Sequence, residues 1–394
     1  MIDWLVKKFI KDPENWEDPA VRERYGLLTG LVGIVLNLLL SAGKLGAGLL
    51  TGSISVTADA FNNLSDAGSS VVTLAGFRMA AKQADEDHPF GHGRIEYLAG
   101  LIVAAAILLV GVELAKTSVE KILSPEAVSF SWLSAGILLA SILVKLWMSW
   151  FNRTLGRRIG SAAMAATAAD SLSDAVATSA VLLGTLVFRF TGYNVDGWVG
   201  LLVAVFILRS GWGAAKDTLD PLLGQSPSAE LVADIERTVL AHPEISGIHD
   251  LIVHDYGPGR SMMSLHAEVP RNADMLEIHD VIDNIERELK EKFHTEAVIH
   301  MDPIVTDDPE VVRTREEMET IAEETIPGMT IHDFRMTAGS DHKNLIFDAA
   351  VPLGCQLSDQ EVASAIARKT AERLGPGYFT VVSVDRAYAP LPPV

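Results

Sequence analysis

Acidic and amide side chains stand inside two otherwise apolar stretches of the chain. The first stretch contains A-D-A-F-N-N-L-S-D-A-G, with Asn62 and Asp66, and the second contains A-A-D-S-L-S-D-A, with Asp170 and Asp174. Residues four apart lie on one face of a helix, so each pair can present two oxygen ligands together. If the two faces meet, four oxygen-bearing side chains can surround one divalent cation.

The cost of a carboxylate inside a membrane span supports this interpretation. Such a group costs several kcal/mol and is rarely present without a partner or a polar pathway. The alternative to a cation site is that these residues only hold the helices together by hydrogen bonds. That role suits Asn and Ser better than acids. Lys44 and Lys145 lie on other stretches, so the sequence predicts no cation beside the acids. Asp59 shares the face of Asp66 and is interpreted as a neighbouring or helix-start residue.

A second group of possible ligands follows in the segment A-D-E-D-H-P-F-G-H-G-R, residues 84–94. Asp85, His88 and His92 are spaced to share one small cation, and the adjacent glycines allow a tight wrap. Histidine is a common metal ligand but also a common surface residue, so a solvated loop is the alternative.

The last part of the chain contains a repeat. Residues 225–304 read helix, strand, strand, helix, strand, which predicts a small α+β unit of ferredoxin-like type. The pattern then returns, because His332 follows His249 by 83 residues and Asp385 follows Asp302 by the same number. A constant offset over several segments predicts a duplication.

The two copies differ in their possible metal ligands. Five side chains of the first copy could converge on a transition-metal ion: His249, His266, His279, His300 and Asp302. In the second copy Asp348 and Ser383 replace two of these histidines, while His332 and Asp385 remain. We therefore predict a zinc-like site in the first copy only, with surface histidines as the alternative.

Six apolar stretches must position the acidic pairs. A spanning helix needs about 20 largely apolar residues, and we predict six spans, at 26–50, 54–82, 96–121, 130–151, 161–188 and 195–215. With the N-terminus inside, the inner segments carry 11 Lys and Arg and the outer ones three. This asymmetry predicts that both termini are cytoplasmic.

Composition separates the chain into two parts. The 394 residues have a net charge of −19 and a mean hydropathy of +0.24. Residues 1–215 hold 17 Lys and Arg against 18 Asp and Glu, and residues 216–394 hold 15 against 33. The chain therefore offers no basic face for nucleic acid. Cys355 is the only cysteine, which excludes an intrachain disulfide and a thiolate-rich metal site.

Together these motifs resemble the cation diffusion facilitator family over residues from about 20 to 305. The resemblance implies an α-helical membrane protein with six transmembrane helices, followed here by two α+β ferredoxin-like cytoplasmic domains. It implies a homodimer in the inner or plasma membrane, without a prosthetic group, that exports divalent metal in exchange for protons. The implied segments are 1–25 (cytoplasmic), 26–215 (membrane), 216–305 (metal-binding) and 306–394 (second copy).

By this resemblance, Asn62, Asp66, Asp170 and Asp174 form the transport site, and Asp85, His88 and His92 form a loop site. The five tail residues form a regulatory site near the dimer contact. Zinc-type members use two Asp on the second helix and His plus Asp on the fifth. The all-oxygen set here favours a harder ion and resembles the manganese-exporting branch.

Several alternatives remain open at this point. Zn²⁺, Fe²⁺, Co²⁺ and Cd²⁺ are alternative cargoes, and a non-transporting metal sensor is an alternative function. A Mg²⁺-dependent head-group transferase is disfavoured because it needs basic residues beside the acids. Arg94 is expected to pair with an acid at the end of the sixth helix, which would be Asp220. Residues 306–394 lie outside the usual family plan and could be a regulator, a dimer-stabilising layer or a partner-binding surface.

Overall fold

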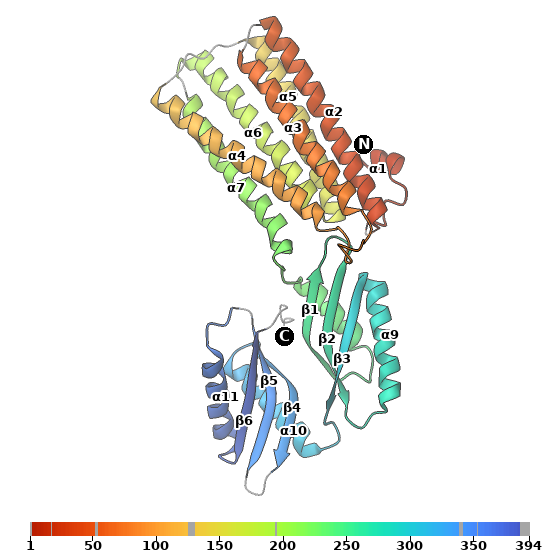
Figure 1. Ribbon diagram of the computed structural model, residues 1–394. Coiled ribbons are helices and arrows are strands. Elements are labelled where there is room, and N and C mark those ends of the chain that lie inside the picture. The colour runs from red at the N-terminus through yellow and green to blue at the C-terminus, as the bar shows by residue number, and fades with distance from the viewer. Residues whose placement is uncertain are drawn as a thin grey trace. The chain divides into compact units, whose positions relative to one another are not determined.

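The computed structural model describes residues 2–16, 18–51, 54–124, 131–193, 195–338, 342–352 and 354–386, without the side chains of 47–51, 54–59 and 196. The chain forms two compact units (Figure 1). The helical unit comprises Met1–Gly224 and Asp255–Arg260, and the tail unit comprises Gln225–His254 and Ser261–Val394.

The helical unit contains one short helix and six long ones. They are α1 (Ile2–Phe9), α2 (Pro19–Thr51), α3 (Ile54–Ala80), α4 (Ile95–Leu123), α5 (Trp132–Ile159), α6 (Ala162–Thr191) and α7 (Asp196–Leu222). Helices α2 to α7 run alongside one another as a bundle (Figure 1).

Five of the long helices are apolar and long enough to cross a membrane: Pro19–Gly46, Ile95–Leu123, Trp132–Ile159, Ala162–Thr191 and Gly197–Leu222. The remaining predicted span corresponds to α3, which has the length of a span but is not among these five. Its polar residues, Asn62, Asn63 and Asp66 among them, lower its hydropathy. Length and composition thus identify five helices among the described residues that could cross a membrane, and the sixth span stays a prediction.

Glycines on α2 allow α3 to approach it closely. A Cβ atom on Gly26 would lie 2.1 Å from the Phe77 side chain, and one on Gly30 would lie 2.6 Å from Leu74. Small residues at such spacing let helix backbones pack directly against each other in membranes. The polar helix α3 is therefore fixed against α2 by shape rather than by its own apolarity.

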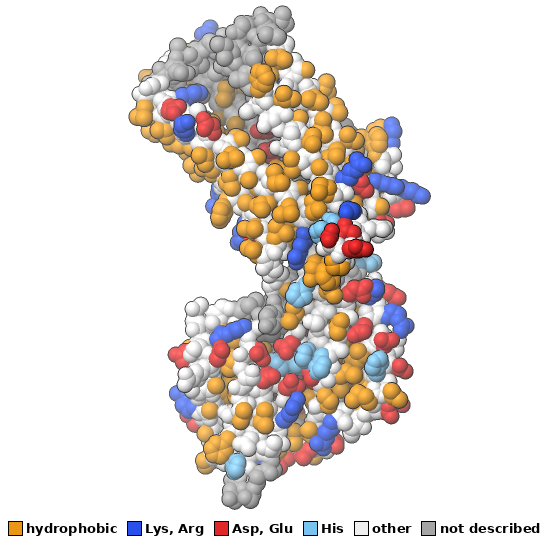
Figure 2. Space-filling view, in the orientation of Figure 1, with side chains coloured by type: hydrophobic (Ala, Val, Ile, Leu, Met, Phe, Trp, Pro, Cys, Tyr) orange, Lys and Arg blue, Asp and Glu red, His pale blue; other side chains and the backbone are white. Residues whose placement is uncertain are grey.

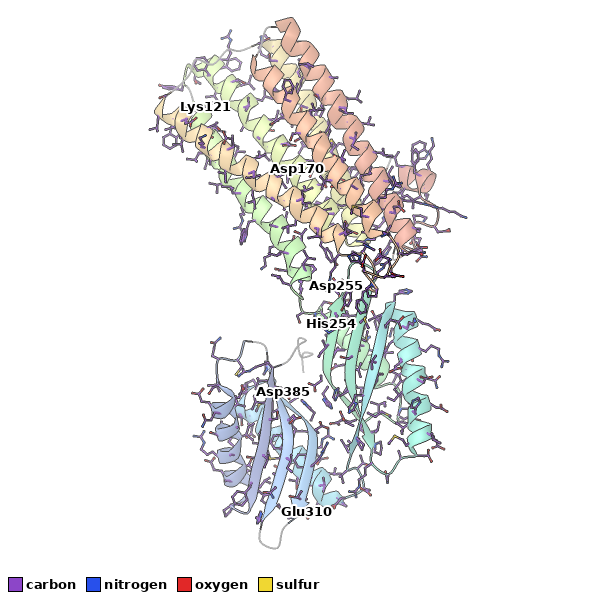
Figure 3. All side chains as sticks on the ribbon, in the orientation of Figure 1. Lys121, Asp170, His254, Asp255, Glu310 and Asp385 are labelled. Atoms are coloured by element: carbon purple, nitrogen blue, oxygen red, sulfur yellow. The ribbon has the colours of Figure 1, made fainter. Side chains whose placement is uncertain are left out.

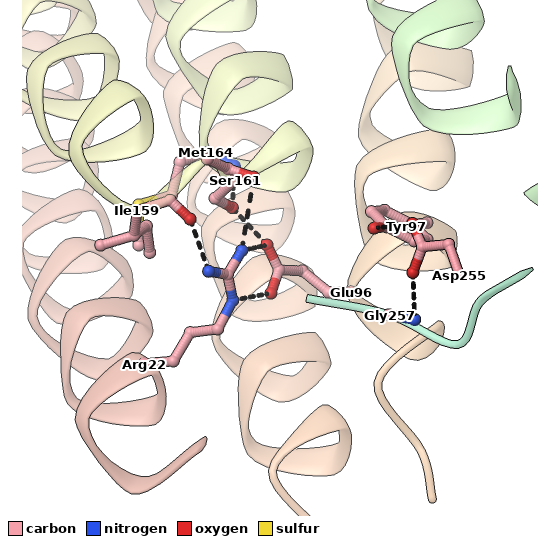
Figure 4. A network of polar contacts seen from close by, with 9 residues as sticks. Arg22, Glu96, Tyr97, Ile159, Ser161, Met164, Asp255 and Gly257 are labelled. Atoms are coloured by element: carbon pink, nitrogen blue, oxygen red, sulfur yellow. Dashed lines mark hydrogen bonds and ion pairs between the residues drawn. The ribbon is translucent and has the colours of Figure 1, made fainter. Parts of the chain in front are cut away.

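A network around a buried ion pair joins four of these helices (Figure 4). Arg22 on α2 donates to both carboxylate oxygens of Glu96 on α4, at 2.7 and 2.9 Å. The Ser161 hydroxyl donates to the same carboxylate at 2.5 Å and accepts from the Met164 backbone N–H. Arg22 also donates to the Ile159 carbonyl at 2.5 Å. The end of α5, the start of α6, α2 and α4 thus share one charged network.

Arg94 pairs differently from the sequence expectation. Its guanidinium donates to the backbone carbonyl of Asp255, at 2.9 and 2.5 Å, rather than to Asp220. The Tyr97 hydroxyl donates to the carboxylate of the same Asp255 at 2.7 Å (Figure 4). Because a carbonyl oxygen is present at every position, sequence spacing could not identify this acceptor.

The tail unit contains two halves with the same order of elements. The first tail half comprises α8 (Ala229–Val239), β1 (Gly247–Asp255), β2 (Ser261–Pro270), α9 (Met275–Phe293) and β3 (Thr295–Ile304). The second tail half comprises α10 (Pro309–Thr325), β4 (Thr330–Ala338), β5 (Lys343–Val351), α11 (Asp359–Leu374) and β6 (Tyr378–Arg386).

Each tail half has its own three-stranded sheet and its own core. The strand orders are β1-β2-β3 and β4-β5-β6, and the last two strands of each sheet are parallel. Apolar side chains on one face of each sheet pack against the helices. In β2, for example, Leu265 and Ala267 are buried in that core, so the alternating His266 lies on the helix-free face.

Replacing Glu96 by alanine tests the charged network. Arg22 would remain buried without its carboxylate partner, which costs about 3–5 kcal/mol when a buried pair is broken. We expect Glu96→Ala to lower the thermal unfolding midpoint of the detergent-solubilised protein strongly. The control is Glu120→Ala, which removes an exposed carboxylate from the same helix. Equal midpoints for the two variants would contradict a stabilising role for the network.

Candidate metal sites

The transport-site acids converge as the sequence predicts. One carboxylate oxygen each of Asp66 on α3 and of Asp170 and Asp174 on α6 lies within 4.8 Å of the others. Figure 3 shows Asp170 inside the helical bundle, away from the ends of the helices. Asp170 and Asp174 are four residues apart on α6, and Asp66 comes from α3. The cluster is therefore the strongest candidate cation site of the helical unit.

The expectation of acids without a nearby cation is wrong. Lys145 on α5 is 2% exposed, and its Nζ lies 2.6 Å from Asp66 Oδ2 and 2.6 Å from Asp174 Oδ2. Spacing along one helix could not reveal this pair, because the contact joins three helices. The available signal was the lone lysine itself, since a charged side chain in an apolar helix requires a partner. The sequence argument against a Mg²⁺-dependent transferase relied on a lack of basic residues beside the acids. Lys145 is such a residue, so that argument does not hold.

Hydroxyl groups fix the helices around this cluster. Ser149, which follows Lys145 by four residues on α5, donates to the Ala168 carbonyl on α6 at 2.8 Å. Thr73 on α3 and Thr167 on α6 share a hydrogen bond of 2.9 Å. Such contacts between apolar helices hold the carboxylates and the ammonium group in register.

The Asn62 side chain is exposed, and no hydrogen bond among the described residues joins it to Asp66, Asp170 or Asp174. The adjacent Asn63 is buried instead and accepts a hydrogen bond from Lys44 Nζ at 3.1 Å. The side chain of Asp59 lies outside the described residues. That Asn62 supplies a fourth ligand stays a prediction.

The loop residues also come together. His88 Nδ1 lies 3.1 Å from Asp85 Oδ1, and His92 Nε2 lies 3.5 Å from Asp85 Oδ2. The Lys82 ammonium contacts Asp85 at 2.6 Å. This hydrogen bond, together with that from His88, lowers the pKa of Asp85 below its ordinary value despite opposing desolvation. The loop thus holds an ionised carboxylate and two imidazoles, a donor set suited to a divalent transition metal.

Four of the five predicted tail ligands meet on the helix-free face of the first sheet. Asp302 lies at the centre, with His266 Nδ1 at 2.7 Å, His249 Nε2 at 3.2 Å and His300 Nε2 at 3.3 Å. Figure 2 shows histidines gathered beside acidic side chains on the tail unit.

The fifth predicted tail ligand, His279, does not join the others within the described residues. It is exposed on α9, next to Ile278, which packs into the core. The prediction of a metal site in the first copy only stays a prediction. His332, Asp348 and Asp385 of the second tail half form a further group of possible ligands.

Two family models match consecutive parts of the chain. The cation efflux transmembrane domain matches residues 30–223, and the cation efflux protein cytoplasmic domain matches residues 227–304. Both matches end before α10, so the second tail half lies outside them.

Curated relatives extend the similarity to named transporters. An uncharacterized transporter of Methanocaldococcus jannaschii is 32% identical, over 69% of this chain and 96% of its own length. A manganese efflux system protein of Bacillus subtilis is 29% identical, over 70% of this chain and 94% of its own. A cadmium, cobalt and zinc/H⁺–K⁺ antiporter of the same organism is 30% identical, over 65% and 82%.

Replacing Lys145 by methionine tests its charge within the carboxylate cluster. Without the ammonium group, three close carboxylates repel one another, and a bound cation relieves that repulsion. We expect Lys145→Met to lower the unfolding midpoint without metal and to increase the midpoint rise that Mn²⁺ causes. The control is Lys116→Met, because Lys116 is exposed on α4. An Mn²⁺-dependent rise no larger than that of the unaltered protein would contradict competition between lysine and metal.

Proposed function

Because the chain belongs to the cation diffusion facilitator family, we propose that it exports Mn²⁺ from the cytoplasm in exchange for protons. The site is the cluster of Asp66, Asp170 and Asp174. The observation that carries the proposal is the convergence of these three carboxylates from two helices of a membrane unit. The transporters among the relatives support a role other than that of an enzyme.

The ligand chemistry supports manganese as the cargo. The cluster offers carboxylate oxygens and no imidazole or thiolate, and oxygen ligands suit Mg²⁺, Ca²⁺ and Mn²⁺ better than softer ions. The similarity to a manganese efflux protein agrees with this assignment. Zn²⁺, Co²⁺ and Cd²⁺ form the second candidate cargo set, because the antiporter relative is named for them.

Lys145 gives the proposed exchange a physical basis. Its ammonium contacts two carboxylates at 2.6 Å, so an entering divalent ion competes for the same oxygens. Three ionised carboxylates and one ammonium carry a net charge of −2, which a divalent cation neutralises. Protonation of the carboxylates on the outer side would weaken metal binding there, and rocking of the bundle would alternate access.

The surroundings of the site complete the proposal. We assign both termini to the cytoplasmic side of the cell membrane, as the Lys and Arg distribution predicts. The matched cytoplasmic-domain family is named for dimerisation, which supports a homodimer. The shared element order of the two tail halves supports their origin by duplication. The loop and tail clusters would bind metal without carrying it across the membrane.

Uptake by proteoliposomes loaded with a metal-sensitive dye tests the transport site. We expect Asp170→Asn to lower Mn²⁺ uptake at least about tenfold, which corresponds to only 1.4 kcal/mol of lost stabilisation. A pH dye in parallel vesicles should report proton flux that accompanies Mn²⁺ and disappears in this variant. The control is Asp217→Asn, which alters an exposed carboxylate of α7.

The same vesicles test the choice of metal. The double variant Asn62→Asp with Asp170→His introduces the donor types of zinc-type members, so uptake should shift toward Zn²⁺. Equal uptake of Mn²⁺ and Zn²⁺ by the unaltered protein would retain the exporter and reject manganese specificity. Absence of uptake for every divalent ion would favour a membrane-held sensor instead.

A further inference from the structure

A histidine pair joins the two tail halves. His249 on β1 and His332 on β4 stack with ring centroids 4.1 Å apart and planes inclined by 21°. Asp250 Oδ2 lies 3.4 Å from His249 Nδ1 and 3.8 Å from His332 Nε2. One ligand atom from each of these three residues lies within 4.8 Å of the others. The group draws on both tail halves, and the resemblance described above assigns no role to Asp250 or His332.

Both imidazoles are buried without hydrogen bonds. The His332 side chain is 4% exposed and the His249 side chain 7%. Neither ring nitrogen of either residue has a hydrogen-bond partner, although carboxylates lie within 4 Å. A buried histidine that serves only packing normally satisfies its ring nitrogens, because an unmade hydrogen bond costs about 1–3 kcal/mol. Both rings lie within 4 Å of the carboxylate of Asp250.

The backbone is arranged to direct these side chains. Asp250 has a φ of +52° and Asp333 a φ of +54°, at equivalent positions directly after the two histidines. The pairing of β4 with β5 shifts register between His332 and Arg335. Bulges re-aim side chains, and non-glycine residues with positive φ concentrate at functional sites. The repeated His-Asp dipeptide is therefore held in an uncommon conformation in both halves.

We propose that His249, Asp250 and His332 bind one divalent transition-metal ion that joins the two tail halves. Asp385 closes the fourth position, since its Oδ2 lies 4.0 Å from His332 Nε2. Two imidazoles and two carboxylates form a tetrahedral set suited to Zn²⁺ or Co²⁺. At a metal–ligand distance of about 2.1 Å the ligand atoms lie about 3.4 Å apart, and the Asp250 Oδ2 to His249 Nδ1 distance is already 3.4 Å.

A neighbouring carboxylate supports this ligand geometry. While His249 Nδ1 faces the proposed ion, its Nε2 lies 3.2 Å from Asp302 Oδ2. A metal-bound histidine commonly donates its other N–H to such a group, which fixes the tautomer and the ring orientation. Asp302 thereby links this site to His266 and His300. Because each tail half has a separate core, the ion would couple two independently packed bodies.

Counting bound Co²⁺ on the full-length chain tests this site. The metal-stripped protein in detergent is dialysed against Co²⁺ alone, in a background of Asp66→Asn, Asp170→Asn and Asp174→Asn that silences the membrane site. We expect His332→Ala to bind one Co²⁺ fewer per chain and to lose visible absorption of histidine-bound Co²⁺. The control is His342→Ala, because His342 is exposed in the same tail half.

Two further variants keep the test decisive. His266→Ala with His300→Ala should retain this ion, since neither residue ligates it. If His332→Ala does not fold, Asp250→Asn replaces it, because asparagine has the same shape and accepts a positive φ. An unchanged Co²⁺ count in Asp250→Asn, or in a folded His332→Ala, overturns the proposal. The count does not depend on transport, so a failed export assay leaves this result unaffected.

Discussion

The arrangement of the helical unit depends on the cost of placing charge among apolar helices. Asp66, Asp170 and Asp174 require compensation, and Lys145 supplies one positive charge from a third helix. This requirement explains why the least apolar long helix, α3, is packed closely against α2 through glycines. It also explains the hydroxyl contacts that lock α3 and α5 to α6. The fold is therefore organised around a charged centre that apolar packing alone would exclude.

The helical unit contains two buried charge networks that differ in how their charges are compensated. Arg22 and Glu96 form a bidentate pair whose remaining acceptor capacity is used by Ser161. Its charges balance, so it has no electrostatic reason to recruit another ion. The Lys145 cluster has three carboxylates for one ammonium, so its acidic groups are not matched one to one by basic ones.

The sequence predicted the features that depend on local periodicity. Carboxylates spaced four apart were placed on one helix face, and the convergence of Asp66 with Asp170 and Asp174 agrees with that prediction. The order of tail elements was likewise readable from alternating patterns. The partner of Lys145 and the exposure of Asn62 depend on helix rotation and packing, which spacing does not determine. His279 is exposed on α9, and its role as a ligand stays a prediction.

The differences between the two tail halves acquire a meaning once their sheets are compared. His266 pairs with His300 across β2 and β3, and Asp348 pairs with Ser383 at the equivalent place in β5 and β6. The second half thus lacks the imidazoles for a separate copy of the first site. It does contain His332, whose Nε2 lies 3.8 Å from Asp250 Oδ2 of the first half. An imidazole present at the contact and absent elsewhere on the sheet is the pattern expected when two halves share a site.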